Sequence, residues 1–248
     1  MKHVCRALIL FMYEEDFDMY DTMKYESAGR DKMSEHSHTE KSITQQGNPG
    51  KPTGEAGEQM LERMNREHYE VTGWGLSFFE FNTRDTVLDI GCGGGMTLSR
   101  LAEKVPEGEI YGVDYSALSV AKSKEMNKAV VESGRMKIVE GSVDALPFDN
   151  EMFDKITTVE SFYFWPTPEK SLSEVYRVLK SGGVFILVAD IHGAAELTED
   201  QIENIKRYDL RNPTPKEFET LFETAGFDKV HVHTKEGTSW IAVEGRRK

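Results

Sequence analysis

The sequence has 248 residues, of which 38% are hydrophobic, and it carries a formal net charge of −13 at pH 7. This length suffices for one domain with a full hydrophobic core and additional segments. The negative charge would repel a nucleic-acid backbone and no basic run offsets it, so composition excludes nucleic acid and favours small, uncharged or cationic partners.

Cysteine content and hydropathy indicate a cytoplasmic protein. Only two cysteines are present, Cys5 and Cys92, which is typical of a reducing compartment and not of a disulfide framework. No apolar run approaches the ~18 residues that a membrane-spanning helix needs. The apolar segment Val4–Tyr13 is short, is interrupted by Arg6 and lacks a small-residue cleavage site, so we expect no signal peptide and no membrane partner.

Residues 1–53 differ in composition from residues 54–248. Their long polar part cannot bury enough apolar area to offset the entropy of ordering, and a Gly- and Pro-rich stretch, residues 47–52, ends it. We therefore predict an N-terminal extension over residues 1–53, partly disordered or forming a lid, and one domain over residues 54–248. A mobile tail is the preferred interpretation, while aromatic and methionine side chains offer the lid alternative: Met12, Tyr20 and Tyr25.

The first predicted helical region covers residues 55–81. Residues on one face recur at steps of three and four: Met60, Leu61, Met64, His68 and Val71. Gly73 and Gly75 are predicted to break this run.

A strand, a glycine turn and a helix follow. Residues 86–90 are an apolar run rich in β-branched side chains, typical of a buried parallel strand. Gly91, Gly93 and Gly95 then allow the backbone to turn sharply and to approach a ligand closely. Helical spacing resumes at about residues 95–104. This is the first unit of an open α/β sheet, whose ligands bind at the carboxyl ends of the strands.

Residues in and near the glycine turn indicate which class of ligand binds there. A dinucleotide-binding fingerprint requires a glycine where this chain has Met96. The charge of Asp89 would repel a pyrophosphate but suits an ammonium or sulfonium group. Asp114 ends the next predicted strand, residues 109–113, where a carboxylate can bind the two hydroxyls of a ribose.

This Asp-x-Gly-x-Gly-x-Gly run with its downstream acid resembles the class I S-adenosylmethionine-dependent methyltransferases. The resemblance extends from about Gly54 to the C-terminus. It implies S-adenosyl-L-methionine as the cofactor and methyl transfer as the activity. The implied fold class is α/β, a Rossmann-like open seven-stranded, mostly parallel sheet with helices on both faces and a C-terminal antiparallel hairpin strand.

The remaining predicted elements fit that sheet. The further strands are residues 136–140, 154–159, 184–189, 228–234 and 238–244, the last two forming a hairpin around residues 235–237. The further helices are residues 116–132 with Ser116 as N-cap, 168–179 with a glycine stop at Gly182 and Gly183, 200–210, and one that Thr214 caps and Gly226 ends.

The resemblance also assigns the methionine end of the cofactor. Asp89 would take the amino group, directly or through water. An N-terminal helix in this family lies near the same end, so Asn65 and His68 are candidates there, with a plain covering helix as the alternative. Backbone groups come from the glycine turn: Gly91, Cys92, Gly93 and Gly95.

The ribose and adenine end follows the second strand. Asp114 would hold the ribose, Tyr115 offers a flat face to the adenine, and Ser116 lies beside them. Similar enzymes place an acid for the adenine amino group in the loop at residues 141–144. This chain has Ser142 there, which leaves that partner open; the neighbouring candidates are Val143, through its backbone N–H, and Asp144.

Candidate acceptor-side residues follow the fourth and fifth strands. Glu160 would bind the cofactor's ammonium or act as a general base, or it is a structural acid that caps a turn. His192 is the second candidate base. Tyr163 and Trp165, with the intervening Phe164, form a rim for a flat or cationic substrate, unless these rings fill the core.

No metal site is expected. Methyl transfer from a sulfonium needs none, and His231 and His233 share a strand face without a cysteine or acid at ligand spacing. His36 and His38 lie in the polar extension and are weaker candidates.

The predicted function is methyl transfer to a small-molecule acceptor at oxygen, nitrogen or carbon. One alternative is a dinucleotide-dependent oxidoreductase of the NAD type, which Met96 disfavours. The other is a non-catalytic cofactor-binding regulatory module. The Asn-Pro-Pro-Tyr motif used on nucleic-acid or amide nitrogen is absent, and residues 160–163 stand in its place. The oligomeric state is not indicated.

Overall fold

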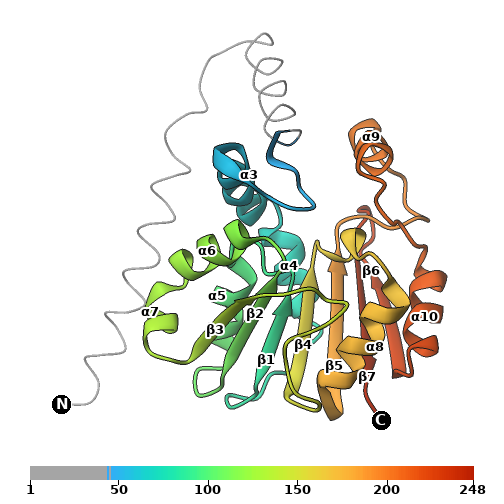
Figure 1. Cartoon of the computed structure of the whole chain (residues 1–248). Coiled ribbons are helices and arrows are strands. Elements are labelled where there is room, and N and C mark those ends of the chain that lie inside the picture. Colours follow the sequence, from blue (N-terminus) through green and yellow to red (C-terminus); the bar gives the residue numbers. More distant parts are fainter. Residues whose placement is uncertain (1–43, 45) are drawn as a thin grey trace. The chain divides into compact units, whose positions relative to one another are not determined.

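The structure is a computed structural model that describes residue 44 and residues 46–248. Seven strands form one sheet in the order β3-β2-β1-β4-β5-β7-β6 (Figure 1). Strands β1 to β5 run parallel, and β7 pairs antiparallel with both β5 and β6, which confirms the predicted fold class. The strands are β1 Val87–Ile90, β2 Ile110–Asp114, β3 Met136–Glu140, β4 Phe153–Val159, β5 Leu179–Ala189, β6 Asp228–Thr234 and β7 Ile241–Arg246.

Helices cover both faces of the sheet, as expected for parallel strands that are apolar throughout. The helices are α3 Gly54–Glu67, α4 Tyr69–Leu76, α5 Met96–Lys104, α6 Ala117–Met126, α7 Lys128–Glu132, α8 Pro168–Val178, α9 Glu199–Tyr208 and α10 Pro215–Thr224, with a 3₁₀ turn, η1, at Phe162–Phe164. Apolar residues of α4, α5 and α6 pack on one face, and those of α8 and α10 pack on the other. In the described part of the chain, no helix is both long and apolar enough to cross a membrane.

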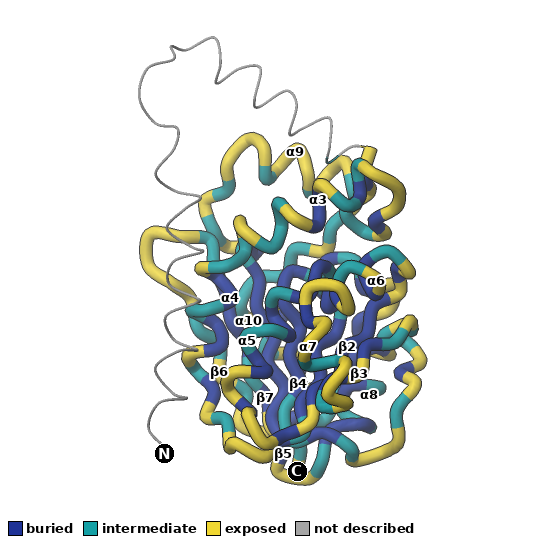
Figure 2. The backbone as a smooth tube through the Cα atoms, turned by 90° about the vertical axis from the view of Figure 1, so that its left-hand side faces the viewer, coloured by how far each residue is buried: buried dark blue, intermediate teal, exposed yellow. Residues whose placement is uncertain are grey.

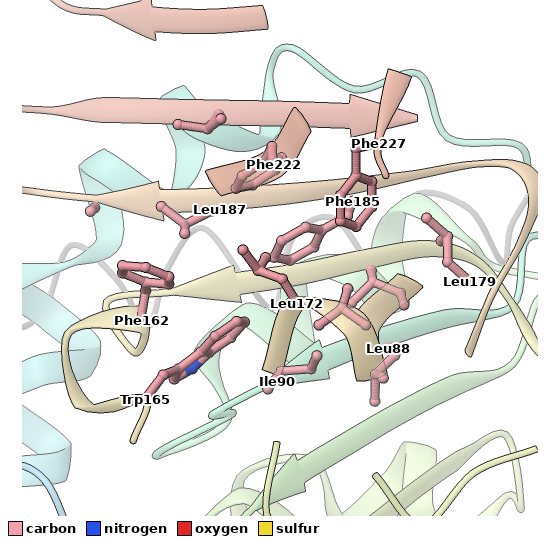
Figure 3. Packing of buried hydrophobic residues seen from close by; sticks show 14 of the residues in the cluster. Leu88, Ile90, Phe162, Trp165, Leu172, Leu179, Phe185, Leu187, Phe222 and Phe227 are labelled. Carbon is pink, nitrogen blue, oxygen red and sulfur yellow. The ribbon is translucent and has the colours of Figure 1, made fainter. Parts of the chain in front are cut away.

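The two cores follow from the alternation of side chains along each strand. In β1, Leu88 and Ile90 face α8 and α10, while Val87 faces α5. Figure 3 shows the first of these cores, where Phe185 of β5 stacks on Phe222 of α10 with ring centroids 5.2 Å apart. Figure 2 shows the strands buried in the centre and α9 exposed at one end. The two cores fix the central strands rigidly, and with them the ends that bear the candidate site.

The first helical region differs from the prediction. The helix does not end at Gly73 or Gly75; α4 runs through both, and the break between α3 and α4 falls at His68 instead. A Cβ on Gly75 would lie 2.3 Å from Val188 of β5, so the absence of a side chain lets α4 pack closely on the sheet. This glycine serves helix–strand packing and not termination.

The second long helix is also divided. The prediction of one helix over residues 116–132 is wrong, because α6 ends at Met126 and α7 begins at Lys128. The side chain of Asn127 donates to the carbonyl oxygens of Gly95 and Ser123, both at 3.0 Å. The bond to Gly95 ties the helix break to the glycine turn.

The predicted glycine stop after α8 lies inside a strand. The helix ends at Val178, and β5 begins at Leu179, earlier than the predicted residue 184. The last strand, predicted at residues 238–244, is displaced to Ile241–Arg246. The early start of β5 follows from the pairing of Leu179 with Phe153 of β4. The backbone of Gly182 and Gly183 bonds to Arg247 at 2.9 and 3.0 Å, so pairing with the last strand extends beyond its predicted end. The predicted cap of α10 is confirmed, because the Thr214 hydroxyl accepts from the Glu217 N–H.

Candidate functional site at the carboxyl ends of the parallel strands

A cavity of about 300 Å³ lies at the carboxyl ends of β1, β2 and β4. This is where ligands of open α/β sheets bind, and the volume lies in the range of small-molecule sites. Most sequence-predicted site residues line it: Asn65, His68, Gly91, Cys92, Gly93, Asp114, Tyr115, Ser142, Val143, Glu160 and Trp165. The others, Asp89, Gly95, Ser116, Asp144, Tyr163 and His192, do not line it.

The glycine turn has the backbone that its sequence predicts. Gly91, Gly93 and Gly95 have φ values of 72°, 49° and 90°, in the left-handed region that favours glycine. A Cβ on Gly91 would lie 2.0 Å from the Ser161 hydroxyl oxygen. Gly95 stands at the start of α5 and packs against Asn127, so its role is in the turn and not in the cavity wall.

Asp114 ends β2 with its carboxylate in the cavity wall. One oxygen accepts from the backbone N–H of Gly93 at 3.0 Å, and the other accepts from that of Ser116 at 2.9 Å. Burial raises the pKa of this carboxyl, and these backbone bonds oppose the rise. A carboxylate offers about four lone-pair sites. The Ser119 side chain and the Tyr115 N–H also favour the ionised form of Asp114. The carboxylate lines the cavity, where hydroxyl groups of a ligand can donate to it.

Ser116 acts beside Asp114 as a structural residue. Its hydroxyl accepts from the Ser119 N–H at 3.3 Å, as predicted for an N-cap, and donates to the Pro52 carbonyl oxygen at 2.8 Å. The second bond fastens the segment before α3 to the cavity. Pro49, Gly50 and Pro52 themselves line the cavity.

Those cavity-lining residues 49–52 lie within the predicted N-terminal extension. The Lys51 ammonium lies 5.5 Å from the centroid of the Tyr115 ring, and a Cβ on Gly50 would be 3.1 Å from Phe164. The sequence places this Gly- and Pro-rich segment in the extension and assigns it no site residue. The lid candidates Met12, Tyr20 and Tyr25, like Cys5, His36 and His38, lie outside the described residues.

Asp89 lies behind the cavity wall. Its side chain is 1% exposed and accepts from the Thr157 hydroxyl of β4 at 2.7 Å. Burial raises the pKa of this carboxyl to about 7, although the Thr157 bond favours the ionised form. A cationic group bound beyond the carboxyl end of β1 would favour the ionised form of Asp89. Asp89 can therefore attract such a group electrostatically without contacting it.

The loop after β3 contributes two of its three predicted residues. Ser142 and Val143 line the cavity next to the exposed ring of Tyr115. Asp144 is directed elsewhere, because its carboxylate accepts a short hydrogen bond from the Ser171 hydroxyl of α8. The substitution of an acid by Ser142 is therefore not compensated by Asp144 at the wall.

Asn65 and His68 bring α3 and the break before α4 to the opposite wall. The amide of Asn65 donates to the Gly94 carbonyl oxygen at 3.3 Å. The His68 Nε2 atom lies 4.0 Å from a carboxylate oxygen of Glu160. Burial lowers the pKa of this imidazole more than the nearby Asp190 charge raises it. The structure thus brings His68, at the break between α3 and α4, close to Glu160, which lies far along the sequence.

Glu160 directly follows β4 in a left-handed backbone conformation, with φ of 53°. Its Oε2 atom accepts from the Tyr163 hydroxyl at 3.2 Å, while Oε1 is buried without a hydrogen-bond partner. Burial, reinforced by the charge of Asp190, raises the pKa of Glu160 well above its usual range. Glu160 is 8% exposed, so this acid is desolvated at the cavity wall.

Tyr163 and Trp165 differ in position. Tyr163 lies behind Glu160 and contacts Asp190, with its hydroxyl 3.0 Å from the Asp190 Oδ1 atom. Trp165 lines the cavity with one part of its ring but is 4% exposed and packs in the core near Phe185. Phe164, by contrast, is half-buried at the wall.

His192 and Cys92 are not suited to act as a base and as a nucleophile, respectively. His192 does not line the cavity; its Nδ1 accepts from the Ala194 N–H at 3.3 Å, and burial lowers its pKa. Cys92 does line it, but burial raises the pKa of the thiol, which receives a bond from the Ser123 hydroxyl at 3.6 Å. Cys92 is therefore present as a thiol and not as a thiolate nucleophile.

One group of described residues brings three metal-ligand types within 4.8 Å of one another: His68, Glu160 and Asp190. The Tyr163 hydroxyl reaches both carboxylates at hydrogen-bond distance, so the group is organised as a hydrogen-bond network. On the hairpin, β7 supplies the acid that sequence spacing did not reveal, since Glu244 lies 3.4 Å from His231 and 3.1 Å from His233.

Sequence reasoning missed Asp190, Thr157 and Ser161. Asp190 had a visible signal, because it directly follows a long apolar strand, and Asp114 likewise stands at the carboxyl end of one. Thr157 and Ser161 had none, since each acquires its role only when β4 pairs beside β1.

The chain is similar in sequence to known methyltransferases. Residues 88–187 match a family model described as "Methyltransferase domain". A 2-methyl-6-phytyl-1,4-hydroquinone methyltransferase from Oryza sativa subsp. japonica is 28% identical over 154 residues, which is 62% of this chain and 44% of that protein. A sterol 24-C-methyltransferase from Pneumocystis carinii is 32% identical over 119 residues, covering 48% of this chain and 30% of that protein. The chain thus spans less than half the length of these two relatives.

A solved structure from Thermotoga maritima is similar in fold. It is titled a SAM-dependent methyltransferase, possible histamine N-methyltransferase, and superposes with a TM-score of 0.62 at 20% identity. The alignment covers 77% of this chain and 95% of that one.

Proposed function

We propose that this chain, which carries a class I S-adenosylmethionine-dependent methyltransferase domain, transfers a methyl group from S-adenosylmethionine to a small organic acceptor. One observation carries the proposal. A single cavity is lined both by Asp114 and by Glu160 and Trp165, while Phe164 and Tyr115 lie on either side of Gly50 at the same wall. A cofactor and an acceptor can therefore meet inside one desolvated space.

The cofactor end fits an S-adenosyl group by its donors and acceptors. The carboxylate of Asp114 lines the cavity and suits ribose hydroxyls, and the ring of Tyr115 suits the adenine face. Gly91, Cys92 and Gly93 line the same cavity, but their N–H groups already donate to Val113 and Asp114, so the turn would serve the cofactor by close approach. When bound, the cofactor supplies an electrophilic methyl group, while the protein supplies position and electrostatics.

The acceptor end favours a molecule with an apolar ring or chain. Its wall combines apolar groups with one acid whose Oε1 atom has no hydrogen-bond partner: Leu61, Met64, Val159, Glu160, Phe164 and Trp165. Two relatives are named for a 2-methyl-6-phytyl-1,4-hydroquinone and a sterol, which are apolar molecules bearing hydroxyls. We propose an acceptor of this kind, uncharged or cationic, and not a nucleic acid, because the chain carries a net charge of −13.

Glu160 is the proposed base at this end. It lines the cavity, whereas His192 does not. Burial raises the pKa of Glu160, and perturbed acids of this kind concentrate at functional sites.

The test begins with ligand binding. Calorimetry should show that both S-adenosylmethionine and S-adenosylhomocysteine bind, because the contacts named above are to parts that they share. Neither ligand binding at millimolar concentration would refute the proposal, and binding of NAD alone would establish the oxidoreductase alternative.

The acceptor is then sought with methyl-labelled S-adenosylmethionine and fractionated metabolite and lipid extracts. Label should enter a small organic fraction and remain absent from bulk tRNA. Transfer to tRNA with no transfer to any metabolite fraction would overturn the acceptor class. Binding without any transfer would instead favour the regulatory module.

We also propose a cytoplasmic location, which rests on the presence of only two cysteines. Fractionation of the native source with antibody detection tests it, and recovery in an organelle or membrane fraction would contradict it.

A further inference from the structure

We infer that Glu160 and Asp190 hold one proton between them and act together as the base that takes a proton from an O–H or N–H group of the acceptor. This inference rests on the proposed methyl-transfer function and names a second acid for it. It also narrows the acceptor to molecules that present such a donor next to the methylated atom.

The topology places the two acids together. Glu160 follows β4 and Asp190 follows β5, and these strands are parallel neighbours with Val159 paired to Val188. Because the carboxyl ends of both strands reach the same edge, the residues that follow them meet there. The Glu160 N–H donates to the Val188 carbonyl oxygen at 3.0 Å, which fixes this register.

The hydrogen bonds of the Tyr163 hydroxyl leave one of two neighbouring carboxylates without a donor, which favours a proton shared by the two acids. Its hydroxyl oxygen accepts from the N–H groups of Asp190 and Ile191 at 3.0 and 3.4 Å, so both lone pairs are used. The same oxygen lies 3.2 Å from Glu160 Oε2 and 3.0 Å from Asp190 Oδ1. It has one proton and can donate to only one carboxylate. Because the hydroxyl oxygen can accept no further bond, an added proton must lie on the carboxylates themselves, whose oxygens are within 4.8 Å of one another, and it lowers the charge that faces this oxygen.

No described cation neutralises the pair. Within the part of the chain that the structure describes, the ion pair from Glu160 to His68 is the only one that either acid makes, at 4.0 Å. Burial lowers the pKa of that imidazole more than the nearby Asp190 charge raises it. Glu160 is buried and Asp190 is half-buried, and two like charges this close do not both ionise readily, so one proton is retained.

The free Oε1 atom of Glu160 points to the ligand's chemistry. It is buried without a partner in a residue that lines the cavity. Leaving such an atom unpaired is costly, so a bound donor is expected to fill it. The left-handed φ of 53° at Glu160 adds backbone strain of the kind that concentrates at functional sites.

The step balances as follows. The new bond forms with the acceptor's lone pair while the sulfur keeps the electrons of the broken S–C bond. The acceptor's proton passes to Glu160 Oε1, and the proton already on Oε2 passes to Asp190 Oδ. The pair changes from one proton to two and loses its single negative charge, just as the sulfonium loses its positive charge. Charge separation is therefore avoided in a desolvated site.

The first test needs neither cofactor nor acceptor. Carboxyl groups of ¹³C-labelled protein are titrated by NMR, with Glu160→Gln and Asp190→Asn used to assign the two resonances. We expect one proton to stay on the pair above pH 7, and the Glu160 carboxyl to titrate about one pH unit or more lower in Asp190→Asn. Both carboxyls fully ionised at pH 7 in the unmodified protein would overturn the inference.

The second test uses any acceptor found in the labelling experiment. Asp190→Asn should lower kcat by about 100-fold with KM within about threefold, and Asp190→Glu should restore part of the rate. The matched control is Asp209→Asn, an exposed residue at the end of α9 that should leave kcat unchanged. An unchanged kcat and pH profile in folded Asp190→Asn would refute the inference while leaving methyl transfer intact.

A divalent ion is the competing occupant. Calorimetry with Mn²⁺ and with Zn²⁺ should show no binding that depends on Asp190. Micromolar binding that Asp190→Asn removes would assign the cluster to a metal and overturn the shared proton.

Discussion

The two ends of the cavity are built in different ways. At the cofactor end, Asp114, Gly93 and Ser116 lie within one strand-turn-helix unit and the strand beside it, and backbone N–H groups make the bonds. At the acceptor end, the Tyr163 hydroxyl contacts the carboxylates of Glu160 and Asp190, which follow separate strands. Backbone bonds depend little on side-chain identity, whereas contacts between side chains depend on it directly, so substitutions alter the second group more readily than the first.

The largest expected effect tests whether Trp165 belongs to the acceptor end or to the core. Trp165→Ala should lower the free energy of unfolding by about 3–5 kcal/mol, because the ring is buried and packs near Phe185. Phe164→Ala, at the same wall but half-buried, should cost about 1 kcal/mol and weaken acceptor binding more than cofactor binding. Urea denaturation measures both, and equal stability losses would show that the two rings share one role.

The next effect tests the glycine turn. Gly91→Ala combines a left-handed φ with a Cβ placed 2.0 Å from the Ser161 hydroxyl, so we expect a loss of about 2–4 kcal/mol and no measurable cofactor binding. The matched control is Gly134→Ala, which has a similar φ of 80° but nothing within 4 Å. It should cost about 1 kcal/mol. If the two variants behave alike in denaturation and calorimetry, the close approach to Ser161 is not what requires glycine.

Asp114 tests the ribose assignment. Asp114→Ala should weaken binding of S-adenosylhomocysteine by roughly 1.5–3 kcal/mol, since hydrogen bonds to a charged group are lost. The exposed acid Asp149 offers the control, and Asp149→Ala should leave the affinity unchanged. Unchanged affinity in Asp114→Ala, measured by calorimetry, would mean that the ribose is held elsewhere.

The smallest effect concerns Asp89 and pH. Its pKa in the folded protein is about 7, above the ordinary value of 3.8, so the folded state binds a proton that the unfolded state has lost. Stability should therefore fall as the pH rises through this window, by on the order of 2 kcal/mol between pH 5 and pH 8. Asp89→Asn should remove that slope in denaturation curves at the two pH values. A slope that persists in Asp89→Asn belongs to another group.

How far the sequence predicts this molecule depends on the range of each interaction. The sheet, its strands and the turn at Gly91 to Gly95 were predicted because apolar runs and glycines act over a few residues. The start of β5 was not, since Leu179 pairs with Phe153 of β4, and Gly182 and Gly183 bond to Arg247, far along the chain. Gly75 was interpreted as a break because its partner, Val188, cannot be seen in the local sequence.

The sequence by itself determined the fold class and the carboxylate that ends β2 at the cofactor end, because local backbone geometry and strand order place both. Tertiary structure alone decided that Asp144 bonds to Ser171, that Trp165 is also a core residue, and that Asp190 joins Glu160. The physical reason is that pairing of β4 with β5 and packing of α8 bring together groups that no local pattern relates. Desolvation, which raises the pKa of Glu160, arises only from that assembly.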